Sequence, residues 1–302
     1  MEKNKGILYA IGAYVMWGLF PIYWKQLETI DALQLIGHRI AWSFVLLFVF
    51  VLITRQWRTF RGVAFNPKTI RIYLMAAVLI CINWFTYVWA VNHDFVVETS
   101  LGYYINPLFS VLLGVFFFRE HLRPVQWIPI ALAATGVTYL AVSYGSLPWI
   151  ALTLAFSFGL YGMVKKMAPL NSLYGLTLET GLLLMPALAY LIFCETAGQG
   201  AFLHSGPLKD WMMVGAGLVT TVPLLLFSAA VPRVPLTTIG ILQYINPTMQ
   251  FLLGVLVYKE PFTRQSLIGF GIVWAGLILF WAEGLFARRN IAPEPAPEMG
   301  EG

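Results

Sequence analysis

Ten long apolar runs constrain this chain more than any other feature of its sequence. About 20 residues, each rising about 1.5 Å along a helix, span the roughly 30 Å hydrocarbon core of a bilayer. A soluble core could not hide all of these runs, because 59% of the residues are hydrophobic and only 11% are charged. We therefore predict an all-α integral membrane protein whose ten transmembrane helices cover residues 7–24, 33–53, 72–92, 97–118, 125–143, 147–164, 174–194, 210–230, 236–258 and 265–286.

Lysine and arginine are unevenly distributed over the two sides that these helices define. Most of the 19 basic residues lie in the two terminal segments and in every second connection, and few lie in the alternate connections. An excess of Lys and Arg marks the cytoplasmic connections of a membrane protein, so we expect both termini in the cytoplasm. This bias accounts for the net charge of +5. The charge therefore predicts a lipid bilayer, and no nucleic acid, as the partner.

A sequence repeat divides the chain into two halves. Residues 104–120, YINPLFSVLLGVFFFRE, align with residues 244–260, YINPTMQFLLGVLVYKE, at an offset of 140 residues. We therefore predict two five-helix repeats, 1–145 and 146–290, followed by a disordered cytoplasmic tail, 291–302, rich in Pro and Glu. Because five is odd, the second repeat enters the membrane upside down. Such inverted-topology repeats are typical of secondary transporters, whose substrate site lies near the membrane midplane between the halves.

Several stretches carry a resemblance to a known family. They are WGLFPIYWK (17–25), HRIAWS (38–43), NWFTYVWAVN (83–92), ETSLGYYINPL (98–108), GSLPWIALTLAFSFGLYGMVKK (145–166), VTTVPLLLFSAA (219–230) and QYINPT (243–248). In these stretches, and across residues 6–288, the chain resembles the RarD group of the EamA-like drug/metabolite transporters. The resemblance implies ten spanning helices in two EamA-type repeats and a small-molecule carrier in the bacterial inner (plasma) membrane. Proteins of this group are named for chloramphenicol sensitivity, which does not imply a physiological substrate.

Each copy of Tyr-Ile-Asn-Pro is predicted to interrupt a helix, at Pro107 and Pro247. Proline has no N–H, so the carbonyl four residues earlier loses its helix partner. An unsatisfied carbonyl is costly in lipid, so such a break faces protein or a wet cavity. Asn106 and Asn246 lie roughly 14 Å deep, near the midplane. We expect paired hinges that line the pathway; the alternative is a structural kink in which each Asn bonds a neighbouring helix.

Four charged residues in or beside the spans are candidates for transport roles. Arg39 lies within the second span, where a charge is costly and often functional, although an arginine at this depth could also snorkel outward. Lys25 ends the first span, either as an interface anchor or as part of an outer vestibule with Arg39. Glu98 starts the fourth span as a helix cap, a counter-charge for Arg39 or a proton carrier. Glu179, in the seventh span, is either an interface residue or a coupling group.

Aromatic and amide side chains complete the predicted pathway. Asn83 and Tyr87 lie i, i+4 on one face of the third span, with Trp84 beside them. An aromatic lining with a few amide groups suits amphipathic or aromatic small molecules, whereas anchoring at the membrane interface is the alternative for any one aromatic residue. The predicted substrate-binding or pathway residues are Trp17, Lys25, Arg39, Asn83, Trp84, Tyr87, Tyr103, Tyr104, Asn106, Tyr161, Gln243, Tyr244 and Asn246, with Glu98 and Glu179 as possible coupling groups.

Motifs of enzyme chemistry are missing from the sequence. It contains no H-E-x-x-H, G-x-S-x-G or P-loop pattern, so we expect no catalytic activity, no metal, no cofactor and no direct use of ATP. The favoured hypothesis is a secondary carrier that moves a small organic molecule by alternating access, by export or exchange. A channel-like pore and a non-transporting scaffold are the alternatives. The substrate, the driving force and the oligomeric state are left open by the sequence.

Overall fold

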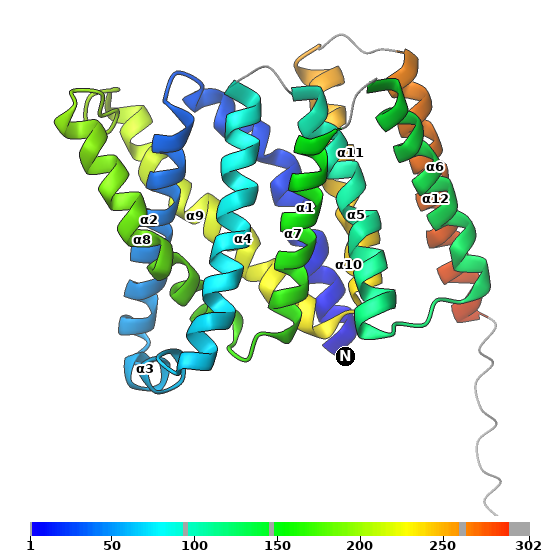
Figure 1. The fold of residues 1–302 in the computed structure, drawn as a ribbon, viewed down its shortest axis with the longest axis horizontal. Helices are drawn as coiled ribbons and strands as arrows, with labels where there is room; N and C mark the ends of the chain where they lie inside the picture. The colour runs from blue at the N-terminus through cyan, green and yellow to red at the C-terminus, as the bar shows by residue number, and fades with distance from the viewer. Residues whose placement is uncertain (1, 93–95, 145–147, 260–263, 290–302) are drawn as a thin grey trace, which may run out of the picture.

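The structure is a computed structural model that describes residues 2–92, 96–144, 148–259 and 264–289 (Figure 1). Within it, nine segments are long and apolar enough to cross a membrane, and a tenth helix contains a shorter apolar stretch, Leu267–Phe280. These segments correspond one by one to the ten predicted spans. The prediction of an all-α membrane protein with ten spanning helices is therefore confirmed. The predicted tail, 291–302, lies outside the described residues.

The first half contains five long helices and one short helix. They are α1 (Glu2–Trp24), α2 (Ala32–Ile53), α3 (Trp57–Ala64), α4 (Pro67–Asn92), α5 (Val96–Phe118) and α6 (Trp127–Tyr144). The short α3 lies in the connection predicted over 54–71, on the face of the molecule at which α1 begins (Figure 1). We call this face the N-terminal face and the other the opposite face.

The second half repeats this order, with one helix divided into shorter pieces. It contains α7 (Trp149–Met167), α8 (Ser172–Thr196), α9 (Pro207–Ala230), α10 (Leu236–Gln243), α11 (Ile245–Leu252), a π-helical turn (Leu253–Val257) and α12 (Arg264–Arg289). Short 3-10 turns cover Lys25–Leu27, Pro124–Gln126 and Val231–Arg233. The succession α10, α11 and π turn occupies the place that the single helix α5 has in the first half.

Helix caps at equivalent positions show how α2 of the first half aligns with α8 of the second half. The side chain of Asp31 accepts from the backbone N of Gln34 at 3.0 Å, and that of Asn171 accepts from the N of Tyr174 at 2.9 Å. Each cap satisfies an N–H group that a helix start leaves without a partner. The two caps are separated by the same 140 residues as the two Tyr-Ile-Asn-Pro motifs. Residues of the two halves that differ by 140 are therefore equivalent. We call such residues mates, and we use the same word for the helices that occupy equivalent places in the two halves.

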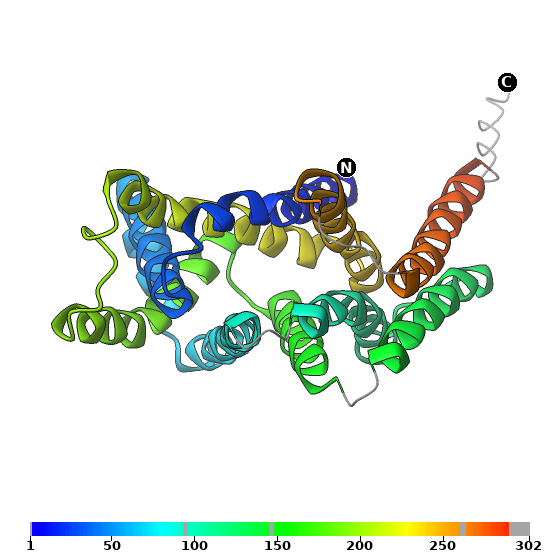
Figure 2. The ribbon, with the colours of Figure 1, turned by 90° about the horizontal axis from the view of Figure 1, so that it is seen from above.

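The main helix–helix contacts recur when the two halves are exchanged. Among the closest neighbours, α1 packs against α9 and α11, and its mate α7 packs against α4 and α5. Three helices pack against their own mates, in the pairs α2–α8, α5–α10 and α6–α12. Viewed from above, the helices form two rows, with α6 and α12 together at one edge (Figure 2). This is the packing of an inverted repeat, with a pseudo-two-fold axis passing between the members of each mate pair.

Two mate glycines allow α6 and α12 to approach closely. A Cβ atom on Gly136 would lie 2.9 Å from the carbonyl O of Gly269 in α12, and one on Gly276 would lie 2.7 Å from the carbonyl O of Pro129 in α6. The hydrophobic effect does not drive helix association in lipid. Small residues at such crossings stabilise the helix pair because they let the backbones pack closely. The same contact thus occurs twice across this helix pair.

The two Asn-Pro motifs differ in their effect on the helix. In the second half the helix is divided at Tyr244, between α10 and α11, close to Pro247. In the first half α5 continues as one helix from Val96 to Phe118 with Pro107 inside it. A helix can pass through a proline if neighbouring groups satisfy the carbonyl that the ring leaves free. The predicted pair of breaks is therefore found in one copy only.

Candidate functional site

The two Tyr-Ile-Asn-Pro motifs meet between the halves. The hydroxyl of Tyr244 donates to the backbone carbonyl of Tyr104 at 3.2 Å, and the two rings lie 6.2 Å apart. Both tyrosines are buried. Since Tyr104 and Tyr244 are mates, this contact lies beside the pseudo-two-fold axis. Segments that are 140 residues apart in sequence are thus in direct contact in the structure.

The motif asparagines are buried and bonded along their own helices. The side-chain oxygen of Asn106 accepts from the Ser110 hydroxyl at 3.4 Å, and that of Asn246 accepts from the Gln250 amide at 2.9 Å. Ser110 and Gln250 are mates, so the pairing is repeated in both halves. The Gln250 amide also lies 3.3 Å from the carbonyl O of Trp17 and links α11 to α1. The asparagine oxygens therefore stabilise their own helix turns.

Gln243 is the last residue of α10 and lies at the helix break. Its side chain is buried, and its amide oxygen has no hydrogen-bond partner among the described residues. A buried polar atom without a partner costs free energy unless a ligand or water satisfies it. Gln243 is therefore the motif-region residue best suited to contact a bound molecule.

Arg39 occupies the opposite half of the membrane thickness from the N-terminal face. It is the eighth residue of α2, which begins at the opposite face, so it lies about 10 Å deep at about 1.5 Å per residue. Its Nε donates to the hydroxyl of Thr220 in α9 at 2.9 Å. Its guanidinium carbon lies 4.9 Å from the ring centre of Trp24 and 4.5 Å from that of Trp84. Arg39 is thus held by both halves of the protein and does not extend freely to the surface.

Two tyrosines extend the surroundings of Arg39 towards the motif in α5. The rings of Tyr87 and Tyr103 lie 5.9 Å apart, edge to face. Both are close enough to Arg39 to interact with it electrostatically. Tyr103 precedes Tyr104, which contacts Tyr244. We call Arg39, Trp24, Trp84, Thr220, Tyr87 and Tyr103 the Arg39 cluster.

Asn83 has a different role from its predicted neighbours. Its amide nitrogen donates to the carbonyl O of Leu154 at 3.0 Å and to the hydroxyl of Ser157 at 3.1 Å. Both acceptors belong to α7, so Asn83 holds α4 and α7 together. Interhelical bonds of this kind stabilise membrane bundles.

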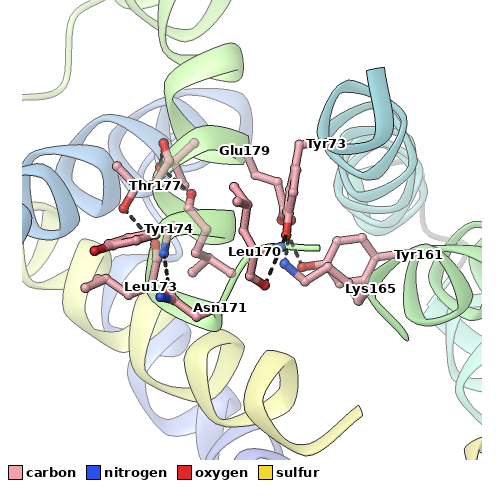
Figure 3. A network of polar contacts seen from close by, with 11 residues as sticks. Tyr73, Tyr161, Lys165, Leu170, Asn171, Leu173, Tyr174, Thr177 and Glu179 are labelled. Atoms are coloured by element: carbon pink, nitrogen blue, oxygen red, sulfur yellow. Dashed lines mark hydrogen bonds and ion pairs between the residues drawn. The ribbon is translucent and has the colours of Figure 1, made fainter. Parts of the chain in front are cut away.

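Glu179 lies in a buried ion pair rather than at an interface. Its Oε1 is 2.5 Å from the Nζ of Lys165, and its Oε2 accepts from the Tyr161 hydroxyl at 3.1 Å (Figure 3). The paired side chains are only 3% and 5% exposed. Tyr73 adds an aromatic ring 5.2 Å from the Lys165 ammonium. Two buried donors thus satisfy the carboxylate oxygens, as a buried polar group requires.

Lys165 therefore differs from the sequence-based expectation. By its position in the sequence, Lys165 belongs, with Lys166, to the basic residues that are expected in a cytoplasmic connection. The structure places it inside the last turns of α7, buried against α8. It shares one helix face with Tyr161, because residues spaced i, i+4 lie one above the other. The spacing of Tyr161 and Lys165 was visible in the sequence. Its meaning became clear only when the structure placed Glu179 against both side chains.

Two phenylalanines lie between Trp17 and Tyr161, which come from the first helices of the two halves. Phe227 lies 5.6 Å from Trp17 and 6.1 Å from Tyr161, measured between ring centres. Phe158 lies 5.7 Å and 5.9 Å from the same two rings. Sequence reasoning did not identify these phenylalanines, because an aromatic residue in an apolar run carries no signal of its own.

Matched cation–ring contacts occur near the two ends of the bundle. Lys25 lies 4.0 Å from the ring centre of Tyr258, and Lys166 lies 5.2 Å from that of Phe118. Tyr258 and Phe118 are mates, and Lys25 aligns with Lys166 in the repeat. Lys25 thus contacts the second half rather than Arg39. The predicted vestibule of Lys25 with Arg39 has no direct contact within the described chain.

Glu120 is a site residue that the sequence-based reasoning did not select. Its two oxygens accept from the backbone N of Leu236 at 2.6 Å and of Thr237 at 2.9 Å, and Lys166 lies 3.4 Å away. A carboxylate at the start of a helix is favoured by the exposed N–H groups and the helix dipole. Glu120 follows α5 and caps α10, so it links the two halves at the N-terminal face. Its identity with residue 260 of the repeat was the available signal.

The predictions for Glu98 and for metal binding depend on which residues the structure describes. The side chain of Glu98 lies outside the described part of the structure. Within the described residues, no group of three or more His, Cys, Asp or Glu side chains is arranged to hold a metal ion.

An inverted repeat of apolar helices with a charged, aromatic cluster between the halves is the architecture of a membrane transporter. The sequence model of the family described as "EamA-like transporter family" matches the chain twice, over residues 4–142 and 147–282. The chain belongs to the EamA-like transporter family and, within it, to the RarD group.

Relatives of the chain are named as transporters or as RarD proteins. It is 48% identical to the uncharacterized transporter YojE of Bacillus subtilis (strain 168), over 92% of this chain and 94% of that protein. It is 42% identical to the protein RarD of Streptomyces exfoliatus, over 96% and 93% of the two chains. It is 30% identical to the chloramphenicol-sensitive protein RarD of Pseudomonas aeruginosa, over 95% and 97%.

A solved structure supports the fold alone. A crystal structure superposes with a TM-score of 0.68 at 18% identity, covering 95% of this chain and 99% of the other. At this identity the match shows that the two helical architectures are alike. It carries no information about the molecule that is transported.

Proposed function

We propose that the protein is a secondary carrier that moves a small organic molecule across the bacterial inner membrane by alternating access. The observation that carries this proposal is the packing pattern, whose main contacts recur when the two halves are exchanged. Two equivalent arrangements of one bundle allow a central site to open to either side in turn. Export or exchange is the proposed direction.

The proposed site lies between the halves, from the Arg39 cluster to the contact of Tyr104 with Tyr244. Arg39 is bonded across the halves to Thr220, so a relative movement of the halves would change its surroundings. Gln243 supplies a buried polar oxygen without a partner among the described residues. The interrupted helix at Tyr244 is the proposed hinge, with Pro107 and Pro247 in supporting positions.

We place the N-terminal face in the cytoplasm. The connection that contains α3 holds the basic residues Arg55, Arg58 and Arg61, and an excess of such residues marks the cytoplasmic side. In this orientation the Arg39 cluster lies in the outer half of the membrane and the Lys165–Glu179 pair in the inner half. A carrier with this orientation receives its exported substrate from the N-terminal face.

Glu179 is the proposed coupling group if transport consumes a proton gradient. Protonation of its carboxylate would weaken the ion pair with Lys165 and free a buried ammonium, so one proton would alter the contact of α7 with α8. Glu98 remains the second proposal for this role. A carrier without coupling would instead leave Glu179 charged throughout the cycle.

Counterflow in proteoliposomes tests the carrier proposal. Liposomes with and without the protein would be loaded with a small-molecule extract of bacterial cells and also with chloramphenicol, the compound in the name of one relative. Mass spectrometry would identify compounds that leave only in the presence of protein. A carrier should then show saturable flux of the identified compound and acceleration when the same compound is present on the far side.

The alternatives give different results in the same experiment. Flux that rises linearly with concentration and shows no acceleration from the far side would identify a channel-like pore. An absence of protein-dependent release of every compound would favour a non-transporting scaffold. A matched vesicle preparation with Lys209→Gln, an exposed change at the opposite face, controls for reconstitution.

A further inference from the structure

Arg39 is a cation inside a membrane span without an acidic partner in the described structure. Among the described residues its hydrogen bond runs from Nε to the neutral hydroxyl of Thr220, and the rings of Trp24 and Trp84 lie against its guanidinium. No Asp or Glu oxygen of the described residues lies within 4.0 Å of it. Charges in membrane spans are costly and are normally compensated by a partner or used in function. Arg39 therefore calls for an anion that comes from elsewhere.

The inverted repeat contains a direct comparison. Arg39 and Glu179 are mates, each the eighth residue of its helix. Trp24 and Lys165 are also equivalent, because residues 17–25 align with 158–166. In the second half the charged residue at this position therefore has its counter-ion, at 2.5 Å. In the first half a tryptophan stands where the counter-ion would be, and no described acidic side chain compensates the charge of Arg39.

The hydrogen-bond geometry indicates which anion fits. A guanidinium carries five N–H donors in one plane, and Nε accounts for only one of them. The terminal nitrogens Nη1 and Nη2 of Arg39 have no hydrogen bond with any described residue. Two neighbouring terminal N–H groups match the two oxygens of a carboxylate in a bidentate pair. The aromatic rings beside Arg39 provide flat apolar surface for the remainder of the molecule.

We propose that Arg39 binds the carboxylate of the transported molecule, and that this molecule is a small organic anion with a planar body. That the bound molecule is also transported rests on the proposed carrier function, but its binding can be measured without transport. It assigns Trp24, Trp84, Tyr87 and Tyr103 to the planar part of the ligand.

Equilibrium dialysis of the full chain in nanodiscs of phosphatidylcholine tests this assignment. The probe is radiolabelled indole-3-acetate, and its matched neutral competitor is indole-3-acetamide, which has nearly the same shape without the charge. Unlabelled indole-3-acetate should displace the probe, and the amide should require about tenfold or more higher concentration, the effect of losing one charge-assisted interaction. Chloride and sulfate serve as inorganic competitors.

Two variants connect binding to the guanidinium. Arg39→Gln should raise the dissociation constant of indole-3-acetate about tenfold or more and leave that of indole-3-acetamide nearly unchanged. Arg39→Lys keeps the charge but not the bidentate geometry, and should fall between the two. Lys209→Gln removes an exposed charge that bonds to the Thr29 hydroxyl, and should leave both constants as in the natural chain. Gel filtration of each variant in detergent, before it enters the nanodiscs, reports whether it elutes as a single species like the natural chain.

The results separate this inference from the carrier proposal. Equal binding of acetate and acetamide forms, no measurable binding of either, equal effects of Arg39→Gln on both, or equally strong displacement by chloride would overturn the carboxylate site. Counterflow in proteoliposomes could still establish a carrier in each of those cases. Carboxylate binding that depends on Arg39, in a protein without saturable flux, would keep the site and reject the carrier.

Discussion

Removal of the Lys165 ammonium should destabilise the protein strongly. The side chains of Lys165 and Glu179 are 3% and 5% exposed and their charged atoms lie 2.5 Å apart. In Lys165→Met, Glu179 would retain only the Tyr161 hydroxyl, at 3.1 Å, as a side-chain donor. Removing one member of a buried ion pair costs about 3–5 kcal/mol, because the remaining charge is left without compensation. We expect a loss within this range in the free energy of unfolding.

Replacement of both charges should restore most of the lost stability. Apolar residues in place of a buried ion pair are often neutral or stabilising by about 1–4 kcal/mol. In the double variant Lys165→Met/Glu179→Leu, the Tyr161 hydroxyl would lose its acceptor, which costs about 1–3 kcal/mol. These effects oppose each other, so the double variant should unfold within about 2 kcal/mol of the natural chain.

Unfolding of the purified protein by sodium dodecyl sulfate in mixed micelles, followed by circular dichroism, would measure these differences. Lys166→Met is the matched control, since its ion pair with Glu120 is more accessible at 16% and 14% exposure. We expect the control to lose about 1–2 kcal/mol. A loss below about 1 kcal/mol in Lys165→Met, or a double variant as unstable as the single one, would refute the reasoning.

Further changes test the central motif, the glycine packing and the link between the halves. Asn106→Leu and Asn246→Leu should each lower flux about tenfold, because one local side-chain bond is lost, while membrane insertion measured by blotting stays intact; normal flux in both would exclude the motif from the pathway. Gly276→Val should cost about 1–3 kcal/mol of stability, since its Cβ would lie 2.7 Å from the Pro129 carbonyl, and an unchanged unfolding curve would contradict this. Glu120→Gln should cost about 0.5–2 kcal/mol through the weakened helix cap, and faster hydrogen exchange at the start of α10 would show it; unchanged exchange there would argue against the cap. An uncoupled uniport of a monoanion should gain about 2.3 kcal/mol from a potential of 100 mV, so valinomycin-imposed potentials should accelerate flux; indifference to potential would indicate electroneutral exchange.

Part of the Arg39 cluster was predictable from the sequence, but Trp24, Thr220 and the contacts between its members were not. Arg39, Trp84, Tyr87 and Tyr103 were all selected from their residue types and positions, and the structure places them in one cluster. Thr220 was not selected, because a threonine in an apolar run has no distinguishing pattern. A side-chain hydrogen bond between residues 181 apart depends on which helices become neighbours, and spacing along one helix does not reveal this.

The proline motifs illustrate a second limit. The same four residues begin at a helix break in the second half and lie within a continuous helix in the first. The local rule that proline removes one hydrogen bond is the same in both. Its consequence differs between the copies, so the four local residues do not decide by themselves whether the helix breaks.

The sequence by itself determined the number of spans, the two repeats and their inverted relation. These follow from the length of apolar runs in a bilayer of fixed thickness and from an odd number of helices in each half. Only the tertiary structure decided that Glu179 is paired with Lys165 while its mate Arg39 contacts tryptophan and threonine. The physical reason is that charge compensation depends on distances of a few ångströms between side chains from different helices, which are set when the helices pack.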